Sequence, residues 1–241
     1  MRTTLAGLDV RVLQETVGPP TAAVILCHGF GAPGDDLVPL QGELVHLQPS
    51  LASARFYFPA APLSLGGFGW ADSRAWWMID MEALVALQQG DPDALREFRK
   101  KEPDGLAQAR NQLKKLVLDV AAQTGLPMNR VALGGFSQGA MLTTDVALRL
   151  EEAPAGLAIL SGTLLIEDQW RAKAKARAGL PVFQSHGRQD PLLGFQAAEW
   201  LRDLLTESGL GVEFHAFDGG HGIAPEVLPA LASFLARCVR R

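Results

Sequence analysis

Three residues of this chain could together make a reactive serine: Ser137, Asp190 and His221. A serine hydroxyl becomes a nucleophile when a histidine takes its proton, and an acid must hold that histidine in the correct tautomer. Folds that place these groups after successive strands of one sheet can supply them in the chain order serine, acid, histidine. The sequence therefore predicts Ser137 as nucleophile, Asp190 as orienting acid and His221 as general base.

Ser137 lies at the centre of Gly135–Gly139, which has the sequence Gly-Phe-Ser-Gln-Gly. The apolar run Arg130–Gly134 before it is typical of a buried strand, and Ala140–Leu150 after it is typical of a helix. Gly-x-Ser-x-Gly at such a corner predicts a nucleophile elbow, a turn so tight that side chains two residues from the serine would collide. Glycine at both positions removes those Cβ atoms.

Asp190 and His221 are each predicted to lie in a loop that follows a strand. Asp190 comes after Val182–Ser185, and His221 lies in a glycine-rich loop before the last predicted helix. Asp218 is an alternative acid because it is close to His221 in the sequence, although it would have to reach the imidazole from its own loop. Asp190 before Pro191 could also be a simple turn residue. The order and spacing of the residues favour Asp190 as the acid.

The other four histidines are expected to have structural roles. His46 falls within a predicted helix and His215 within a predicted strand, where a surface or packing role is usual. His28 and His186 each precede a glycine at the end of a predicted strand. Histidines in such positions commonly tie loops together by hydrogen bonds.

Two backbone N–H groups are expected to stabilise the oxyanion that develops during acyl transfer. Gln138 supplies one, because its amide opens a helix and gains from the helix dipole. Phe30 is the natural second donor, since glycines on either side allow its loop, Cys27–Asp36, to approach closely. A glycine-rich loop before a helix could instead hold phosphate. This loop has neither the dinucleotide-binding nor the P-loop spacing.

Composition excludes several classes of protein. A chain of 241 residues with 48% hydrophobic and 20% charged residues suits one large α/β domain over residues 1–241. A net charge of −4 provides no basic surface, so no nucleic-acid partner is expected. Cys27 and Cys238 are too few for a disulfide framework and are expected to be buried or semi-buried thiols. Met1–Val17 shows no signal peptide and no apolar run approaches the ~20 residues of a membrane span, so a cytoplasmic protein is expected.

Short apolar runs alternate with longer helical patterns, which predicts a mostly parallel central sheet with helices on both faces. The expected strands are Val10–Thr16, Ala22–Cys27, Arg55–Phe58, Arg130–Leu133, Gly156–Leu160, Val182–Ser185 and Val212–Phe217. The expected helices are Asp35–His46, Met81–Gln89, Pro92–Lys100, Gly105–Thr124, Ala140–Glu151, Gln169–Ala178, Leu193–Ser208 and Pro225–Arg240. Within Gly105–Thr124, a stripe of apolar residues at helical spacing is expected to face the core.

Two segments interrupt this alternation. Pro59–Asp80 is a long loop with three tryptophans, Trp70, Trp76 and Trp77. Loops of this length in a compact domain are usually functional. The tryptophans could line an apolar acyl site or, equally, anchor the loop in the core. The second segment, Gln88–Asp104, is charged and polar with a short helix inside it, and whether it forms a lid is open.

With these residues assembled, the chain resembles the phospholipase/carboxylesterase branch of the α/β-hydrolases, which includes the acyl-protein thioesterases. The resemblance extends from about Ala22 to the C-terminus. Its motifs are Leu26–Gly31, Phe58–Pro62, Ala75–Asp80, Gly135–Gly139, His186–Asp190 and Gly220–His221. The Phe-Ser-Gln core and the Trp-x-Ile-Asp stretch are more specific than Gly-x-Ser-x-Gly alone.

The resemblance implies an α/β-hydrolase fold and hydrolysis of carboxylic esters or thioesters without cofactor or metal. It also implies roles for the residues already singled out: Ser137, Asp190 and His221 as the triad, the amides of Phe30 and Gln138 as oxyanion donors, and the tryptophan loop as a wall of the acyl pocket. The chain departs from the family at Leu192–Phe195, where a Val-Pro type pair is usual, and at Met78, where the family commonly has Phe. Both departures bear on acyl-length preference.

The sequence thus predicts a carboxylesterase that acts on a small-molecule ester or thioester through an acyl-enzyme. An acyl-protein thioesterase or a lysophospholipase is the alternative, and a non-catalytic binding protein on a hydrolase scaffold is a third. The natural substrate, acyl length and stereopreference are open, and both a monomer and a homodimer are compatible with the sequence.

Overall fold

The computed structural model describes residues 1–69, 72–80, 85 and 92–240. In this part of the chain an eight-stranded sheet has the order β1-β2-β4-β3-β7-β8-β9-β10. Its strands are β1 (Arg2–Leu5), β2 (Leu8–Leu13), β3 (Ala22–Cys27), β4 (Ala54–Pro59), β7 (Val131–Phe136), β8 (Gly156–Leu160), β9 (Pro181–Gly187) and β10 (Gly211–Phe217). The two N-terminal strands pair antiparallel, and all pairings from β4 to β10 are parallel. The mostly parallel α/β sheet is therefore confirmed.

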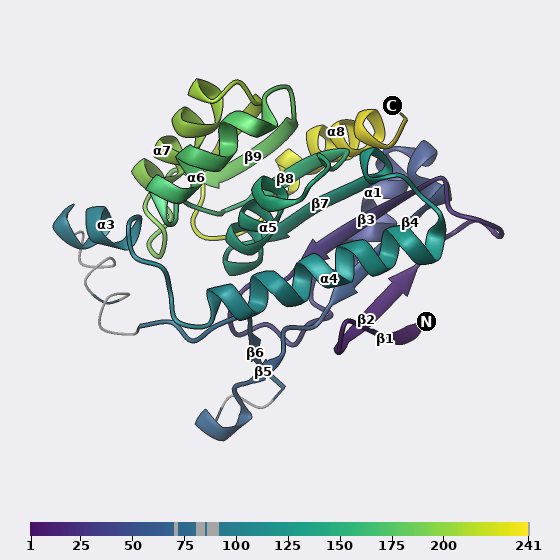
Figure 1. Cartoon of the computed structure of the whole chain (residues 1–241), viewed down its shortest axis with the longest axis horizontal. Coiled ribbons are helices and arrows are strands. Elements are labelled where there is room, and N and C mark those ends of the chain that lie inside the picture. The colour runs from purple at the N-terminus through teal and green to yellow at the C-terminus, as the bar shows by residue number, and fades with distance from the viewer. Residues whose placement is uncertain (70–71, 81–84, 86–91, 241) are drawn as a thin grey trace.

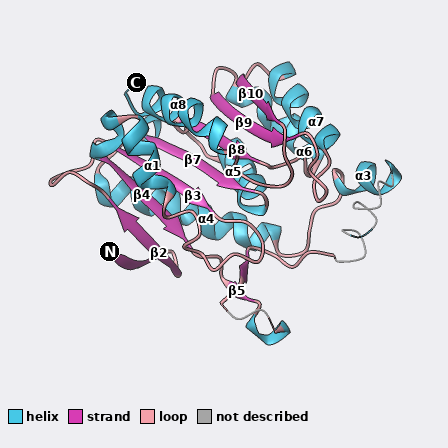
Figure 2. Ribbon diagram, turned by 180° about the vertical axis from the view of Figure 1, so that it is seen from behind, coloured by secondary structure: helices cyan, strands magenta, loops and turns pink. Residues whose placement is uncertain are grey.

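Helices cover both faces of this sheet. The covering helices are α1 (Leu40–Leu47), α4 (Leu106–Thr124), α5 (Gln138–Arg149), α6 (Glu167–Ala174), α7 (Phe195–Glu207) and α8 (Leu228–Arg240), whereas α3 (Pro92–Phe98) projects beyond the sheet. Figure 1 shows α4 and α5 in front of the sheet, and Figure 2, seen from behind, shows α1 and α8 over the opposite face.

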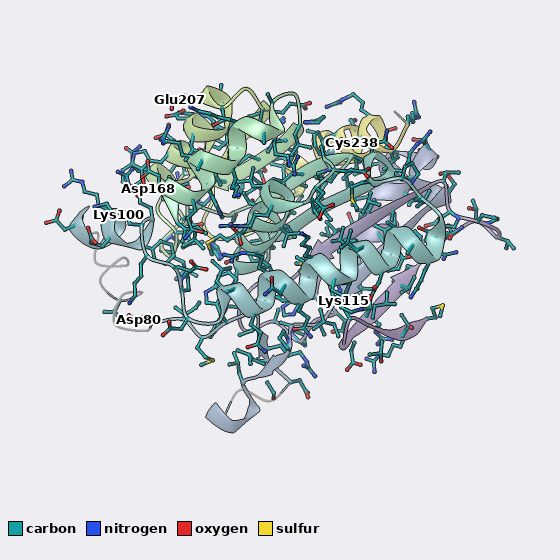
Figure 3. All side chains as sticks on the ribbon, in the orientation of Figure 1. Asp80, Lys100, Lys115, Asp168, Glu207 and Cys238 are labelled. Atoms are coloured by element: carbon teal, nitrogen blue, oxygen red, sulfur yellow. The ribbon has the colours of Figure 1, made fainter. Side chains whose placement is uncertain are left out.

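The central strands contribute side chains to two cores, one on each face. In β3, Ala23, Ile25 and Cys27 pack with α4 and α5, whereas Val24 and Leu26 pack with α1 and α8. Burial on both faces explains why this strand is a continuous apolar run rather than an alternating one. Cys27 and Cys238 are buried thiols, neither of them in a disulfide, and Figure 3 shows Cys238 on α8.

Helix α4 buries the stripe that the sequence predicted. Its buried side chains are Leu106, Ala109, Leu113, Leu116, Val117 and Val120. None of the helices in the described part of the chain has the length and apolar character needed to cross a bilayer.

The structure corrects several expected elements. Strand β1 was not predicted; it pairs with β2 through a two-residue hairpin in which Ala6 and Gly7 both have positive φ, 51° and 77°. Helix α1 begins at Leu40 rather than Asp35, because hydrogen-bonded turns occupy the residues before Pro39. A small antiparallel pair, β5 (Leu63–Ser64) and β6 (Arg74–Ala75), lies within the tryptophan loop. The helix expected at Met81–Gln89 lies, except for one residue, outside the described residues.

Candidate active site

Ser137 connects the end of β7 to the start of α5 in a strained conformation. Its φ of 53° and ψ of −118° are unusual for a residue with a side chain. Its backbone is held on both sides, because its N–H donates to the Leu160 carbonyl at 2.8 Å and its carbonyl accepts from the Met141 N–H at 3.1 Å. The turn therefore presents the Ser137 side chain at the carboxyl edge of the parallel strands.

The two glycines of the elbow are required by close packing against the end of β3. A Cβ atom on Gly139 would lie 2.2 Å from the Cys27 carbonyl oxygen, and one on Gly135 would lie 2.6 Å from the same atom. Real Cβ contacts with backbone are not this short, so the expectation that side chains here would collide is confirmed. The same contact brings the loop after β3 over the elbow.

The structure brings Ser137, His221 and Asp190 together in one hydrogen-bonded chain. His221 Nε2 lies 2.9 Å from Ser137 Oγ, and His221 Nδ1 lies 2.7 Å from Asp190 Oδ2. In this arrangement Nδ1–H donates to the carboxylate and leaves Nε2 to accept the serine proton. Phe136 packs against the imidazole, with 4.9 Å between ring centroids. The three groups can thus pass a proton from the serine to the histidine.

Asp190 is buried and heavily hydrogen-bonded. Its Oδ1 accepts from the N–H groups of Leu192 and Leu193 at 2.9 and 2.8 Å. Its Oδ2 lies 3.2 Å from His186 Nε2 as well as close to His221. Burial on its own would raise the pKa of Asp190, but hydrogen bonds from His186, His221 and the Leu193 amide hold the pKa well below its usual range. Asp190 therefore stays a carboxylate at any ordinary working pH.

Asp218, the alternative acid, does not occupy that position. Its side chain is 87% exposed and lies 3.7 Å from the guanidinium of Arg188. The carboxylate that contacts His221 belongs to Asp190.

The remaining histidines have the structural roles that were expected. His46 is exposed on α1, and His215 stacks on Phe183 with 4.7 Å between ring centroids. His186 is buried and its Nε2 lies 2.7 Å from the Leu193 carbonyl, which ties the end of β9 to the loop that carries Asp190. His28 accepts a hydrogen bond at Nε2 from the Ala61 N–H at 2.9 Å.

His28 makes a pH-dependent contribution to stability. Burial lowers the pKa of His28 to about 4 from 6.5, because the charged imidazolium loses its hydration. In its unprotonated form, Nε2 accepts the hydrogen bond from the Ala61 N–H. The unfolded chain therefore binds the extra proton first. The contribution is complete above pH 6.5 and is lost as the pH falls toward 4, by up to about 3 kcal/mol.

We expect denaturant titrations to show this loss as a difference between variants. The free energy of unfolding of the wild type should fall more between pH 7.5 and pH 4 than that of His28→Gln. The glutamine can still accept from Ala61 but does not titrate. Equal pH dependence in both proteins would contradict the prediction.

The side chain of Gln138 makes contacts that the sequence did not reveal. Its side chain is buried, with Oε1 accepting from the Trp76 N–H at 2.9 Å and Nε2 donating to the Trp77 carbonyl at 2.8 Å. The residue after Ser137 thus fastens the tryptophan loop to the turn between β7 and α5. The signal available in the sequence was the joint presence of Phe-Ser-Gln and of the Trp-Trp pair, but nothing in their spacing indicates contact.

Trp76 and Trp77 lie in the packed core, at 2% and 3% exposure. Trp76 Nε1 donates to the His28 carbonyl at 2.9 Å, so this side chain also holds the loop after β3. Both residues therefore anchor the loop, as one of the two interpretations expected, and their part in an acyl pocket stays a prediction. Trp70 lies outside the described residues.

The loop after β3 crosses directly over the elbow. A Cβ atom on Gly29 would lie 3.3 Å from Ser137 Cβ. The Gly31 N–H donates to the Arg74 carbonyl at 2.9 Å, and the Arg74 N–H donates to the Ala32 carbonyl at 3.0 Å. These bonds fix the loop next to Phe30, whose oxyanion role, like that of the Gln138 amide, stays a prediction. Among the described residues no group of three or more His, Cys, Asp or Glu side chains could hold a metal ion.

Comparisons with known proteins agree with this geometry. Residues 8–239 match the family model described as phospholipase/carboxylesterase. Acyl-protein thioesterase 1 of Eremothecium gossypii is 32% identical over 222 residues, which cover 90% of this chain and 88% of that protein. Acyl-protein thioesterase 1 of Debaryomyces hansenii is 27% identical over 238 residues, with 94% of each chain covered.

Two solved structures show the same fold. Esterase PE8 has a TM-score of 0.76 and 28% identity, and covers 95% of this chain and 97% of that one. SOBER1 of Arabidopsis thaliana has a TM-score of 0.69 and 25% identity, and covers 90% of this chain and 99% of that one. The chain belongs to the phospholipase/carboxylesterase family of α/β-hydrolases and is a serine hydrolase of the carboxylesterase and acyl-protein thioesterase type.

Proposed function

We propose that the chain is a carboxylesterase that forms an acyl-enzyme on Ser137. The observation that supports it most directly is the continuous set of hydrogen bonds from Ser137 Oγ through His221 to Asp190. It lies at a strained elbow where a parallel sheet presents its carboxyl ends. His221 Nε2 lies 2.9 Å from Ser137 Oγ, which is within reach for taking the hydroxyl proton.

In the acylation step Ser137 Oγ attacks the carbonyl carbon of the ester while His221 Nε2 takes the hydroxyl proton. Asp190 stabilises the imidazolium that forms, and its depressed pKa keeps it ionised throughout. The N–H groups of Phe30 and Gln138 stabilise the negative charge on the tetrahedral oxygen. Collapse breaks the bond to the leaving group, which receives its proton from His221.

Deacylation repeats these steps with water. His221 takes a proton from the water, the resulting hydroxide attacks the acyl carbon, and the carboxylic acid leaves as Ser137 Oγ recovers its proton. None of these steps requires a group beyond the side chains and amides named here. The proposal thus assigns one role to each of five residues.

A fluorophosphonate probe tests whether Ser137 is the nucleophile. We expect the folded protein to be labelled with one equivalent, and peptide mapping to place the label on Ser137, because the serine is deprotonated only when His221 lies beside it. Urea-unfolded protein is the control and should not react. A folded protein that is not labelled would favour the alternative of a binding protein on a hydrolase scaffold.

A thioester is the second candidate substrate, because the curated relatives described above are named acyl-protein thioesterases. An oxyester and a thioester of the same acid form the same acyl-enzyme, so the leaving group affects acylation alone. Their kcat/KM values measured side by side therefore report the preference. A burst of thiol or alcohol release with equal kcat values would place the slow step at deacylation.

A further inference from the structure

Ser161 has a backbone conformation that is unusual for a serine. It follows directly after β8, is fully buried and has a φ of 48°. This left-handed conformation is strained for a residue with a side chain and unstrained for glycine. A serine at such a position indicates that its side chain has a task, and strained residues of this kind cluster at functional sites.

The backbone around Ser161 lies between the strands that carry the nucleophile and the acid. The carbonyl of the preceding residue, Leu160, accepts the N–H of Ser137 at 2.8 Å. The N–H of Ser161 itself donates to the Ser185 carbonyl of β9 at 2.8 Å. Figure 1 shows β8 between β7 and β9. The end of β8 is therefore a fixed point relative to Ser137.

The Ser161 side chain reaches the loop that carries the base. Its Oγ donates to the carbonyl of Gly222 at 2.8 Å, and Gly222 is the residue after His221. In the part of the loop before His221, the Gly219 carbonyl accepts from the Gln189 N–H at 3.0 Å. The loop is thus held by hydrogen bonds before and after His221, and the bond after it comes from the Ser161 hydroxyl.

We propose that Ser161 is a positioning residue: its hydroxyl fixes the Gly222 carbonyl and thereby keeps His221 Nε2 within hydrogen-bonding reach of Ser137 Oγ. The inference rests on the proposed function of Ser137 and His221. Ser161 acts through the backbone of the base loop. Loss of the hydroxyl leaves the His221 loop without its attachment to the end of β8, so proton transfer slows while substrate binding is unchanged.

Two substitutions separate this role from a general effect on stability. Ser161→Ala removes the hydroxyl and keeps the strain of the positive φ, whereas Ser161→Gly removes the hydroxyl and relieves the strain. We expect both variants to lose about 10-fold in kcat at unchanged KM, since misplacement of a catalytic group slows the chemical step. The thermal midpoint of the glycine variant should lie above that of the alanine variant. The loss of kcat would then be due to the missing hydroxyl, and the difference in thermal midpoint would be due to the positive φ.

The kcat values are expressed per active site titrated with the fluorophosphonate, which removes any contribution from misfolded protein. Thr144→Val is the matched control, because it removes a buried hydroxyl that donates within α5, to the Ala140 carbonyl. That variant should keep kcat within about twofold.

Wild-type kcat per titrated site in both Ser161 variants would overturn the positioning role. If the alanine variant does not fold, the glycine variant alone decides. The wild type is measured first: if it neither turns over ester nor labels at Ser137, the proposed function fails, and the role of Ser161 fails with it. A loss of kcat in the Ser161 variants, with the wild type and Thr144→Val fully active, supports the positioning role.

Discussion

Replacing Ser137 by alanine is expected to lower kcat/KM for a p-nitrophenyl ester by roughly 10³–10⁶, which is about 4–8 kcal/mol of activation barrier. The change removes the proposed nucleophile, and His221 is left without the hydroxyl to which it is hydrogen-bonded at 2.9 Å. Activity above that of water alone should persist, because oxyanion stabilisation and substrate binding do not depend on the Ser137 side chain.

The measurement needs a control that removes another serine hydroxyl without changing the hydrogen bonds between Ser137, His221 and Asp190. Ser185 on β9 offers one, since among the described residues its buried Oγ has no hydrogen-bond partner. Ser185→Ala should keep kcat/KM close to the wild-type value and lose no stability, because an unsatisfied buried hydroxyl is removed. Near-normal turnover in Ser137→Ala would refute the assignment of the nucleophile.

The central strands could be predicted from the sequence because they are buried on both faces. The structure gives β3 and β8 the bounds Ala22–Cys27 and Gly156–Leu160, as expected. In such strands the apolar run ends where burial ends, so the composition itself marks the boundary. Strand β1 was missed because its hairpin uses Ala6-Gly7 rather than the Asn-Gly or Asp-Gly pair that signals a tight turn.

The order of the three site residues was visible in the sequence, but their supporting contacts were not. The order predicts which strand ends carry Ser137, Asp190 and His221, and parallel strands bring those ends to one edge. The contact of His186 with Asp190, at 3.2 Å, depends on how one loop turns back on itself. The hydrogen bonds of the Gln138 side chain to Trp76 and Trp77 join residues about 60 positions apart, and no local pattern encodes them.

A buried carboxylate on α5 illustrates the same limit. Asp145 has no exposed surface, and it accepts from Arg149 Nε at 2.8 Å and Trp170 Nε1 at 2.9 Å, with Arg110 as a third partner. Helical periodicity alone gives a charged residue no reason to face inward. The partners come from α4 and α6 as well as from α5, so only the packed arrangement of the three helices explains its burial.

The loops that carry Asp190 and His221 cross each other at Gly187. A Cβ atom on Gly187 would lie 2.2 Å from the Gly220 carbonyl oxygen and 2.4 Å from that of Gly219. Both are backbone atoms and cannot rotate away as the end of a side chain could. The hydrogen bond between Asp190 Oδ2 and His221 Nδ1, at 2.7 Å, therefore depends on the absence of a side chain at this crossing.

Gly187→Ala is accordingly expected to lower kcat/KM by about 10²-fold or more. The methyl group must push the loop that carries His221 away from the end of β9 by on the order of 1 Å. A displacement of that size at a catalytic group lowers the rate by about 10²-fold. Gly194→Ala is the matched control, because among the described residues a Cβ atom there meets nothing within 4 Å apart from its chain neighbours. Its kcat/KM should stay within about twofold of the wild type. Folded Gly187→Ala protein with wild-type kcat/KM would mean that the crossing of the two loops does not set the distance between Asp190 and His221.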